Sequence, residues 1–413
     1  MKLILPQFIL IFTVIFAVSY VSVIAQPVLQ EPNRIKDFGK SLKKYEKNSK
    51  ETNKETPKDD ETIRVETNLL VNDVLVVNQK GNLIAGLKKD DFIVTENNES
   101  QEIGLFTFGD DAKVPRSIVL IIDYSTSLLP YIENSIEAAK LLVDKLSDND
   151  RMAIVTDDVE LLVDFTKDKL LLKQTLNVLK KKCLSVKQGG KSWQYSALLS
   201  VLNEMFDEED IHPMIIFQTD GDEYPFLKPL KYYSAIMKQR LPELCKRNIG
   251  YCERNFGFAD ITEKIEKSRA TIYSIIPGIR FVGLLNEEKL KRGERSVADM
   301  LRNNFKETDE NHISAFSKQH AQIEAIEKTT AQASLLEAAN LSGGYTDFIE
   351  KPEDAETVYN TIFQTIANRY VIGYYPKNET KDGKRRTVKI EVKNHPEYIV
   401  MGRKSYIAPL EEK

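Results

Sequence analysis

The sequence predicts an α/β protein in which a Rossmann-like domain, with a mostly parallel sheet covered by helices on both faces, stands beside a small β-sandwich. Three observations predict this fold. Apolar strands alternate with amphipathic helices from Ser117 to about Asn368, a pattern typical of a parallel sheet buried on both faces. Short β-branched runs between Gly and Asn turns precede this region, and further alternating strands follow it.

Length and charge limit the function classes. The chain has 413 residues, of which 42% are hydrophobic, so it can bury a real core and has room for more than one domain. Its net charge is -4, with 58 Lys and Arg against 62 Asp and Glu. An acidic sum gives no electrostatic footprint for DNA or RNA, so nucleic-acid binding is disfavoured.

Residues 1–25 are expected to be a secretory signal peptide. Lys2 precedes an apolar run, and Val23-Ile24-Ala25 offers a cleavage site. The alternative is an uncleaved anchor helix, because the run approaches the ~20 apolar residues that span a bilayer. No cysteine lies near Ala25 to accept a lipid, and no other segment is apolar enough to span. We therefore expect a secreted, periplasmic or cell-envelope protein without a transmembrane span after cleavage.

The region before Ser117 divides into two parts. Residues 26–61 are polar and highly charged, and are expected to form a disordered linker. Residues 62–112 are expected to form a β unit. It is too short for an independent core, so we expect it to pair with the strands predicted in 369–413.

The main domain is expected over 113–368. The predicted strands are Ser117–Ile122, Met152–Val155, Val159–Phe165, Pro213–Phe217, Ala270–Ile276 and Tyr345–Ile349. The predicted helices begin at Pro130 and Asp168, include Ala197 to Met205, and close the domain after Pro352. Two segments, about 224–258 and 282–328, interrupt the alternation and are expected to be insertions or partial helices, because they exceed the usual length of a bare loop.

The cysteines are few. Cys245 and Cys252 could close a small disulfide loop in an oxidising compartment, but spacing alone leaves this open. Cys183 is expected to be a buried small hydrophobic residue. The four histidines are scattered without metal-ligand spacing, which disfavours a zinc enzyme.

Polar residues follow the predicted strands where open α/β sheets place their ligand sites. Asp123, Ser125 and Ser127 follow the first strand, and Asp220 follows the strand that ends at Phe217. Between them in sequence, Gly189-Gly190-Lys191-Ser192 precedes a helix. These carboxylate and hydroxyl oxygens suit a hard cation such as Mg²⁺, with Mn²⁺ or Ca²⁺ as further options.

The chain therefore resembles the von Willebrand factor type A (VWFA) domain with its metal-ion-dependent adhesion site. The resemblance rests on the Asp123/Ser125/Ser127 triplet, the Gly-Gly loop and the Thr219-Asp220-Gly221 turn. Ser192 stands where that family normally offers a threonine, and Lys191 takes the place of a glycine. The resemblance implies that the hydroxyls bind metal directly, while the aspartates often act through water.

The flanking segments resemble the exported bacterial "VWFA-related" subfamily. They are Gly86–Val94 in front, and Tyr370–Pro376 with Arg403–Tyr406 behind. Together with the main domain they cover nearly the whole mature chain. This subfamily resemblance implies fold and site and says little about the ligand.

Two carboxylates and neutral hydroxyls would leave a bound cation electrophilic, able to capture an acidic side chain of a protein or peptide. We therefore expect a metal-dependent, non-enzymatic adhesion module with no catalytic residues. Gly190, Trp193, Asp222 and Glu223 are expected around the rim; Trp193 and Tyr195 are contact residues or core. The alternatives are a metal-assisted hydrolase with Asp222 and Glu223 as acid and base, or a purely structural envelope interaction protein.

Overall fold

The computed structural model describes residues 34–45, 69–109, 115–186, 192–207, 212–223 and 256–411. The predicted signal peptide, the Cys245–Cys252 pair and Gly190 lie outside these residues. In the described part of the chain, no helix combines the length and hydrophobicity that crossing a bilayer requires.

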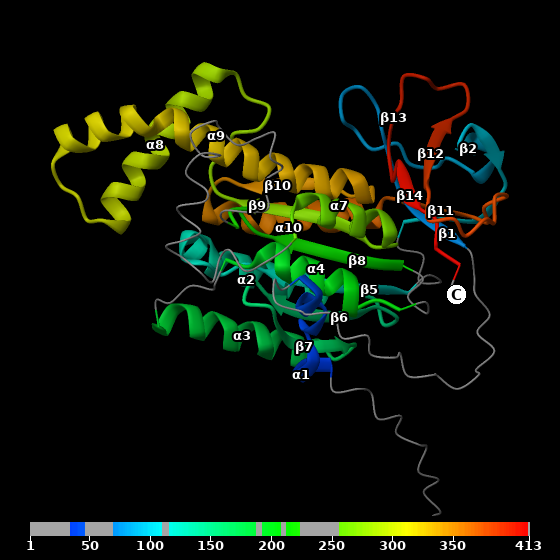
Figure 1. Cartoon of the computed structure of the whole chain (residues 1–413), viewed down its shortest axis with the longest axis horizontal. Coiled ribbons are helices and arrows are strands. Elements are labelled where there is room, and N and C mark those ends of the chain that lie inside the picture. Colours follow the sequence, from blue (N-terminus) through cyan, green and yellow to red (C-terminus); the bar gives the residue numbers. More distant parts are fainter. Residues whose placement is uncertain are drawn as a thin grey trace, which may run out of the picture. The chain divides into compact units, whose positions relative to one another are not determined.

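The centre of the fold is a six-stranded sheet (Figure 1). Its strands, in spatial order, are β10 (Thr346–Ile349), β9 (Thr271–Pro277), β8 (His212–Gln218), β5 (Arg116–Ile122), β6 (Arg151–Thr156) and β7 (Glu160–Thr166). All neighbours are parallel except β6 and β7, which form an antiparallel hairpin. The predicted mostly parallel sheet is therefore confirmed.

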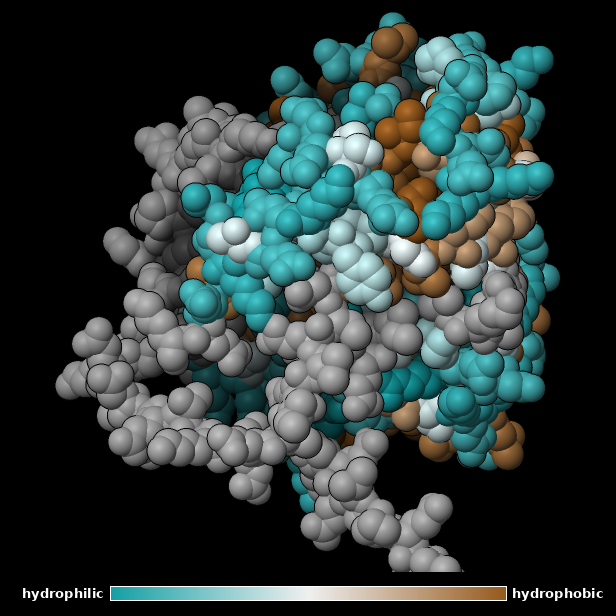
Figure 2. Space-filling model, turned by 90° about the vertical axis from the view of Figure 1, so that its right-hand side faces the viewer, coloured by the Kyte–Doolittle hydropathy of each residue, from teal (hydrophilic) through white to brown (hydrophobic). Residues whose placement is uncertain are grey.

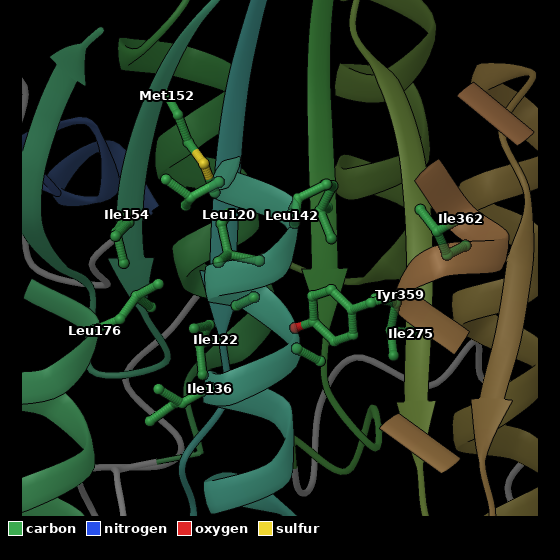
Figure 3. Close-up of a cluster of buried hydrophobic side chains, with 14 of the residues drawn as sticks. Leu120, Ile122, Ile136, Leu142, Met152, Ile154, Leu176, Ile275, Tyr359 and Ile362 are labelled. Atoms are coloured by element: carbon green, nitrogen blue, oxygen red, sulfur yellow. The ribbon is translucent and has the colours of Figure 1, made fainter. Parts of the chain in front are cut away.

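Helices cover both faces of this sheet, as the alternation of strands and helices predicted. The helices α2 (Leu129–Asp144), α3 (Lys169–Val186) and α10 (Ala355–Ala367) pack on one face. Figure 3 shows that core: Leu120 and Ile122 of β5 point towards Ile136 and Leu142 of α2. The helices α4 (Gln194–Glu204), α7 (Phe258–Lys267) and α9 (Glu310–Ser342) contribute to the core on the opposite face, with Val119 and Ile121 of β5. Alternate residues of one buried strand thus serve two cores.

Strands from before and after the central domain form a β-sandwich. One sheet has the order β13 (Ile399–Met401), β1 (Leu70–Val77), β11 (Tyr370–Tyr374), β4 (Ile103–Phe108); the other has β14 (Ser405–Ile407), β12 (Arg385–Val392), β2 (Phe92–Glu96), β3 (Glu99–Gln101). A shared core includes Val74, Phe92, Tyr370 and Ile390. The expected pairing of early and late strands is confirmed.

The outer side of the sandwich is polar. Along β12, buried residues alternate with exposed ones, the exposed set being Arg385, Thr387, Lys389 and Glu391. Figure 2 shows the corresponding face of the molecule, where hydrophobic residues form patches within a largely hydrophilic surface. β12 is therefore buried on one side only, whereas every residue of β11 is buried.

Part of the predicted linker is structured. Residues Arg34–Asp37 form α1 and Lys40–Tyr45 form a 3-10 helix, so disorder is the wrong expectation for this segment. Glu204 accepts hydrogen bonds from the backbone amides of Gly39 (2.8 Å) and Ser41 (2.9 Å). Phe38, Leu42 and Tyr45 pack against the α4 face of the sheet. Three apolar side chains in a polar segment suffice to anchor it because the domain supplies the rest of the core.

The second predicted insertion is helical. It forms α8 (Asn286–Asn304) and the first half of α9, which pack through Val297, Leu301 and Ile313. Figure 1 shows both helices projecting beyond the sheet before α9 continues across its face. Most of the first insertion lies outside the described residues.

Candidate cation-binding site

The loops after β5 and β8 lie side by side because these two strands are adjacent and parallel, with Ile122 paired to Gln218. The backbone amide of Asp123 donates a 2.9 Å hydrogen bond to the carbonyl of Gln218, which extends the pairing by one residue. Both loops leave the carboxyl edge of the sheet, the position at which open α/β sheets bind ligands.

Four predicted site residues meet at this edge. The hydroxyls of Ser125 and Ser127 are 3.2 Å apart, and Ser127 Oγ donates a 3.0 Å hydrogen bond to Asp220 Oδ2. Asp123 is tied to the same loops, since its carboxylate accepts hydrogen bonds from the Ser125 amide at 2.9 Å and from Thr219 Oγ1 at 2.7 Å. The spacing of Asp123, Ser125 and Ser127 therefore does bring three oxygen-bearing side chains towards Asp220.

Ser192, the fifth predicted residue, contacts the site through its backbone. Its amide donates a 2.8 Å hydrogen bond to Asp157 Oδ2, and its φ of 58° is in the left-handed region. Asp157 follows β6 and also accepts a hydrogen bond from the Tyr124 amide at 3.1 Å. Asp157 thus links the loop after β5 to the segment that enters α4.

The carboxylates of the site lie close enough to act on one another's pKa. Burial, together with the charges of Asp157 and Asp220, raises the pKa of Asp123 well above its usual value. Burial also raises the pKa of Asp157 to about 6, although the amides of Tyr124 and Ser192 oppose that shift. Such shifts indicate carboxylates that would be stabilised by an added cation.

The two acidic rim residues have different roles. Glu223 is buried, and its carboxylate accepts hydrogen bonds from the Tyr195 amide (2.6 Å) and from Ser196 Oγ (3.0 Å) at the start of α4. Asp222 Oδ2 lies 3.3 Å from the Lys328 ammonium. Burial would lower the pKa of Lys328, but the charges of Asp222 and Asp220 outweigh it and raise that pKa well above its usual value. Glu223 therefore anchors the start of α4, and Asp222 faces the ammonium group of Lys328.

The aromatic residues near the rim separate into two kinds. Tyr195 is buried and packs edge-on against Phe217 and Phe258, so it belongs to the core. Trp193 is partly exposed, and its amide donates a 3.2 Å hydrogen bond to the Asp157 carbonyl. Of these two residues, Trp193 is the one with an exposed part.

Sequence reasoning did not identify Asp157 and Lys328 as parts of this site, and it singled out Thr219 only as part of the turn that carries Asp220. Thr219 and Asp157 both come directly after buried strands, so their positions carried the same signal that identified Asp123 and Asp220. Lys328 gave no signal, because it lies within a long charged helix 106 residues from Asp222.

The donor set fits a hard divalent cation. All the converging side-chain atoms of Asp123, Ser125, Ser127 and Asp220 are oxygens, which Mg²⁺, Mn²⁺ and Ca²⁺ prefer. Among the described residues, no group of three or more His, Cys, Asp or Glu side chains is arranged to hold a metal ion. Any cation here would depend on hydroxyls as well as carboxylates.

The structure has a mostly parallel sheet with helices on both faces. Loops rich in acidic and hydroxyl side chains lie at the carboxyl edge of this sheet. The sequence resemblance implies both features. The central domain is an α/β fold with a mostly parallel six-stranded sheet covered by helices on both faces. The helices α8 and α9 pack together as a charged hairpin, and α9 carries Lys328 beside this candidate site.

No family model and no curated protein matches the chain. Among solved structures, BatB from Bacteroides thetaiotaomicron is 15% identical with a TM-score of 0.31, covering 61% of this chain and 97% of BatB. The von Willebrand factor domain of the type V pilus tip protein Mfa5 from Porphyromonas gingivalis is 14% identical, with a TM-score of 0.30, over 61% and 95% of the two chains. Manganese-loaded TRAP from Plasmodium vivax is 12% identical, with a TM-score of 0.29, over 76% and 97%. With TM-scores this low, the functions of these proteins cannot be assigned to this chain.

The remaining cysteine prediction concerns Cys183. It is buried, without a disulfide, and burial raises the pKa of its thiol to about 11. A buried thiol with a raised pKa is unreactive, so Cys183 acts as a small hydrophobic residue of the core.

Proposed function

We propose that this chain is an exported, non-enzymatic protein-binding module whose cation site captures a carboxylate of a protein or peptide partner. Asp123, Ser125, Ser127 and Asp220 would hold the cation, Mg²⁺ first and Mn²⁺ or Ca²⁺ as alternatives, and Ser192 would complete the set. A bound cation would supply an electrophilic point for one further anionic oxygen. The protein's own part is to hold these side chains at the edge of a rigid sheet.

One observation carries this proposal. The Ser125, Ser127 and Asp220 oxygens meet beside a buried Asp123 whose charge the described neighbours leave only partly balanced. A purely structural loop would gain nothing from burying carboxylates in this way, because each buried charge without a partner destabilises the fold. A site made to receive a cation accounts for the arrangement.

Isothermal titration with Mg²⁺ and Mn²⁺ tests the proposal on the wild type and on Asp123→Ala and Ser127→Ala. Removing a residue that only supports a metal site typically weakens binding about 10- to 100-fold, and loss of a ligand should weaken it at least as much. Asp144→Asn, a substitution of an exposed carboxylate in the last turn of α2, is the matched control and should bind as the wild type does. Equal affinity in all four proteins would overturn the proposed site.

The exported location is a separate part of the proposal, which rests on the apolar run before Gln26. Sequencing the amino terminus of the mature protein, recovered from the producing cell's envelope or medium, tests it. A chain that begins at Gln26 supports cleavage after Ala25. A chain that retains residues 1–25 would show an anchor instead.

A further inference from the structure

Lys328 of α9 lies against the proposed cation site. Its Nζ is 3.6 Å from Asp220 Oδ2 and 3.3 Å from Asp222 Oδ2. Asp220 Oδ2 is the same oxygen that accepts the hydrogen bond from Ser127. The ammonium group therefore stands next to an oxygen that the proposed function assigns to a divalent cation.

The packing of α9 fixes this placement. Gly221 has a φ of 74°, and a Cβ added there would be 2.9 Å from Leu335 Cδ1 and 3.0 Å from the Ala331 carbonyl oxygen. The helix thus rests directly on the loop that carries Asp220. Ala331 and Leu335 are fully buried, and Lys328 is about one turn earlier on α9.

The surroundings of Lys328 attract an ammonium group strongly. Asp220, Asp222 and Glu324 all act on it as negative charges, and its side chain is only 23% exposed. The Asp220 side chain is 10% exposed, so solvent screens this pair less than a surface ion pair. A lysine is protonated at neutral pH, and this one brings a permanent positive charge to the site.

We propose that Lys328 is a tethered competitor for the divalent cation, which lowers the cation affinity of the site until the ammonium group is displaced. This inference rests on the proposed function, since it assumes a divalent cation at Asp220. The ammonium neutralises Asp220 and Asp222 when no metal is bound. Metal binding then requires that the side chain swings away, and the apparent affinity falls by the fraction of molecules in which it has done so.

Titration of Mn²⁺ into Lys328→Met tests the competitor. Methionine keeps most of the length of the side chain and removes the charge. If the ammonium is displaced in roughly one molecule in ten, the variant binds Mn²⁺ about tenfold more tightly than the wild type. Lys318→Met, an exposed lysine earlier on the same helix, removes the same charge away from the site and should leave the affinity unchanged.

The outcomes separate the two proposals. Equal Mn²⁺ affinity in wild type and Lys328→Met would overturn the competitor and leave the cation site standing. Absence of Mn²⁺ binding from both, at millimolar metal, would overturn the proposed function and the competitor together. Tighter binding by Lys318→Met as well would show a general charge effect and would also overturn the competitor.

Hydrogen exchange of the wild type gives a readout that does not depend on the variant's folding. Displacement of Lys328 removes a contact that holds α9 to the loop, so Mn²⁺ should speed amide exchange in α9 near Lys328. Exchange elsewhere in α9, around His312, should not change. Mn²⁺ that binds and leaves or lowers the exchange rate near Lys328 would contradict displacement.

Discussion

Buried carboxyl groups have raised pKa values at one edge of the central sheet and lowered pKa values at the other. At the carboxyl edge, Asp123, Asp157 and Asp220 lie together, and the pKa values of Asp123 and Asp157 are raised. At the amino edge, where the sandwich packs, acidic groups have cationic partners and the pKa values of Asp73 and Asp150 are lowered. At the first edge, carboxylates repel one another. At the second edge, the Asp73–His212 pair joins two parts of the fold.

The amino edge is a network of paired groups. His212 at the start of β8 is 2.6 Å from Asp73 of β1, and Arg369 Nη1 donates to the Asp73 carbonyl at 3.2 Å. Arg116 at the start of β5 donates to Asp150 through Nε at 2.9 Å. The contacts of His212 and Arg369 with Asp73 reach β1 of the sandwich and help to specify how the two parts pack, whereas Arg116–Asp150 joins β5 to the residue before β6 within the central domain.

The comparison teaches that buried acidity alone does not mark a functional site. What distinguishes the carboxyl edge is the sign of the pKa shift, together with neutral hydroxyls beside the carboxylates. In the absence of metal, replacing an acidic side chain should therefore cost much more stability at the amino edge than at the carboxyl edge.

The largest expected effect is at the amino edge. Asp73→Ala removes the partner of His212 and a negative charge that acts on the buried Arg369, so we expect a loss of about 3–5 kcal/mol in the free energy of unfolding. Urea denaturation measures it. Asp299→Ala, which removes an exposed carboxylate of α8, is the control and should cost less than about 1 kcal/mol. Similar losses in the two variants would contradict a structural role for this network.

A smaller effect is expected where α9 rests on the carboxyl edge. Gly221→Ala places a side chain at a left-handed φ and against Leu335 and the Ala331 carbonyl. We expect a loss of about 1–3 kcal/mol in unfolding free energy, again by urea denaturation. Gly81→Ala shares a left-handed φ but has open space around the added carbon, so it should cost less. Equal costs would show that α9 does not press on this loop.

The pH dependence of stability sharpens the contrast. Burial alone would raise the pKa of Asp73, but the charge and hydrogen bond of His212 outweigh it and lower the pKa from 3.8 to about 2. A lowered folded pKa gives stability that is present above the unfolded value and is lost as the pH falls towards 2. The wild type should therefore lose about 2 kcal/mol more than Asp73→Asn between pH 5 and 2, measured by denaturation at each pH. Parallel losses would refute the assignment.

The smallest effect is expected at the centre of the candidate site. Asp123→Asn keeps an acceptor for the Ser125 amide and removes one charge from the acidic cluster. In chelator, unfolding free energy should change by less than about 1 kcal/mol, because lost hydrogen-bond strength and relieved repulsion oppose each other. A loss as large as that of Asp73→Ala would show that Asp123 is structural.

The sheet and its two cores were predictable because the signal is local. Runs such as Ile118–Ile122 and Met214–Phe217 are continuous and apolar, and they become the buried strands β5 and β8. The loops that follow these strands placed Asp123 and Asp220 together for the same reason. Sequence spacing was sufficient to predict which residues meet wherever the order of the strands decides their neighbours.

Features set by distant packing were not predictable. Phe38, Leu42 and Tyr45 lie in a polar stretch and become ordered only against the α4 face of the domain. Lys328 meets Asp220 because α9 crosses the sheet, which its charged sequence does not reveal. The amphipathic helix α7 is a different case, since Phe258, Ile261 and Ile265 have helical spacing that could have identified it.

The most direct test of the cation site is a crystal structure of the full mature chain grown with Mn²⁺, with anomalous scattering used to locate the metal. We predict a single strong peak within ligand distance of Ser125 Oγ, Ser127 Oγ and Asp220, with Lys328 turned away from it. A well-ordered carboxyl edge with no anomalous peak, and Lys328 still against Asp220, would contradict the account.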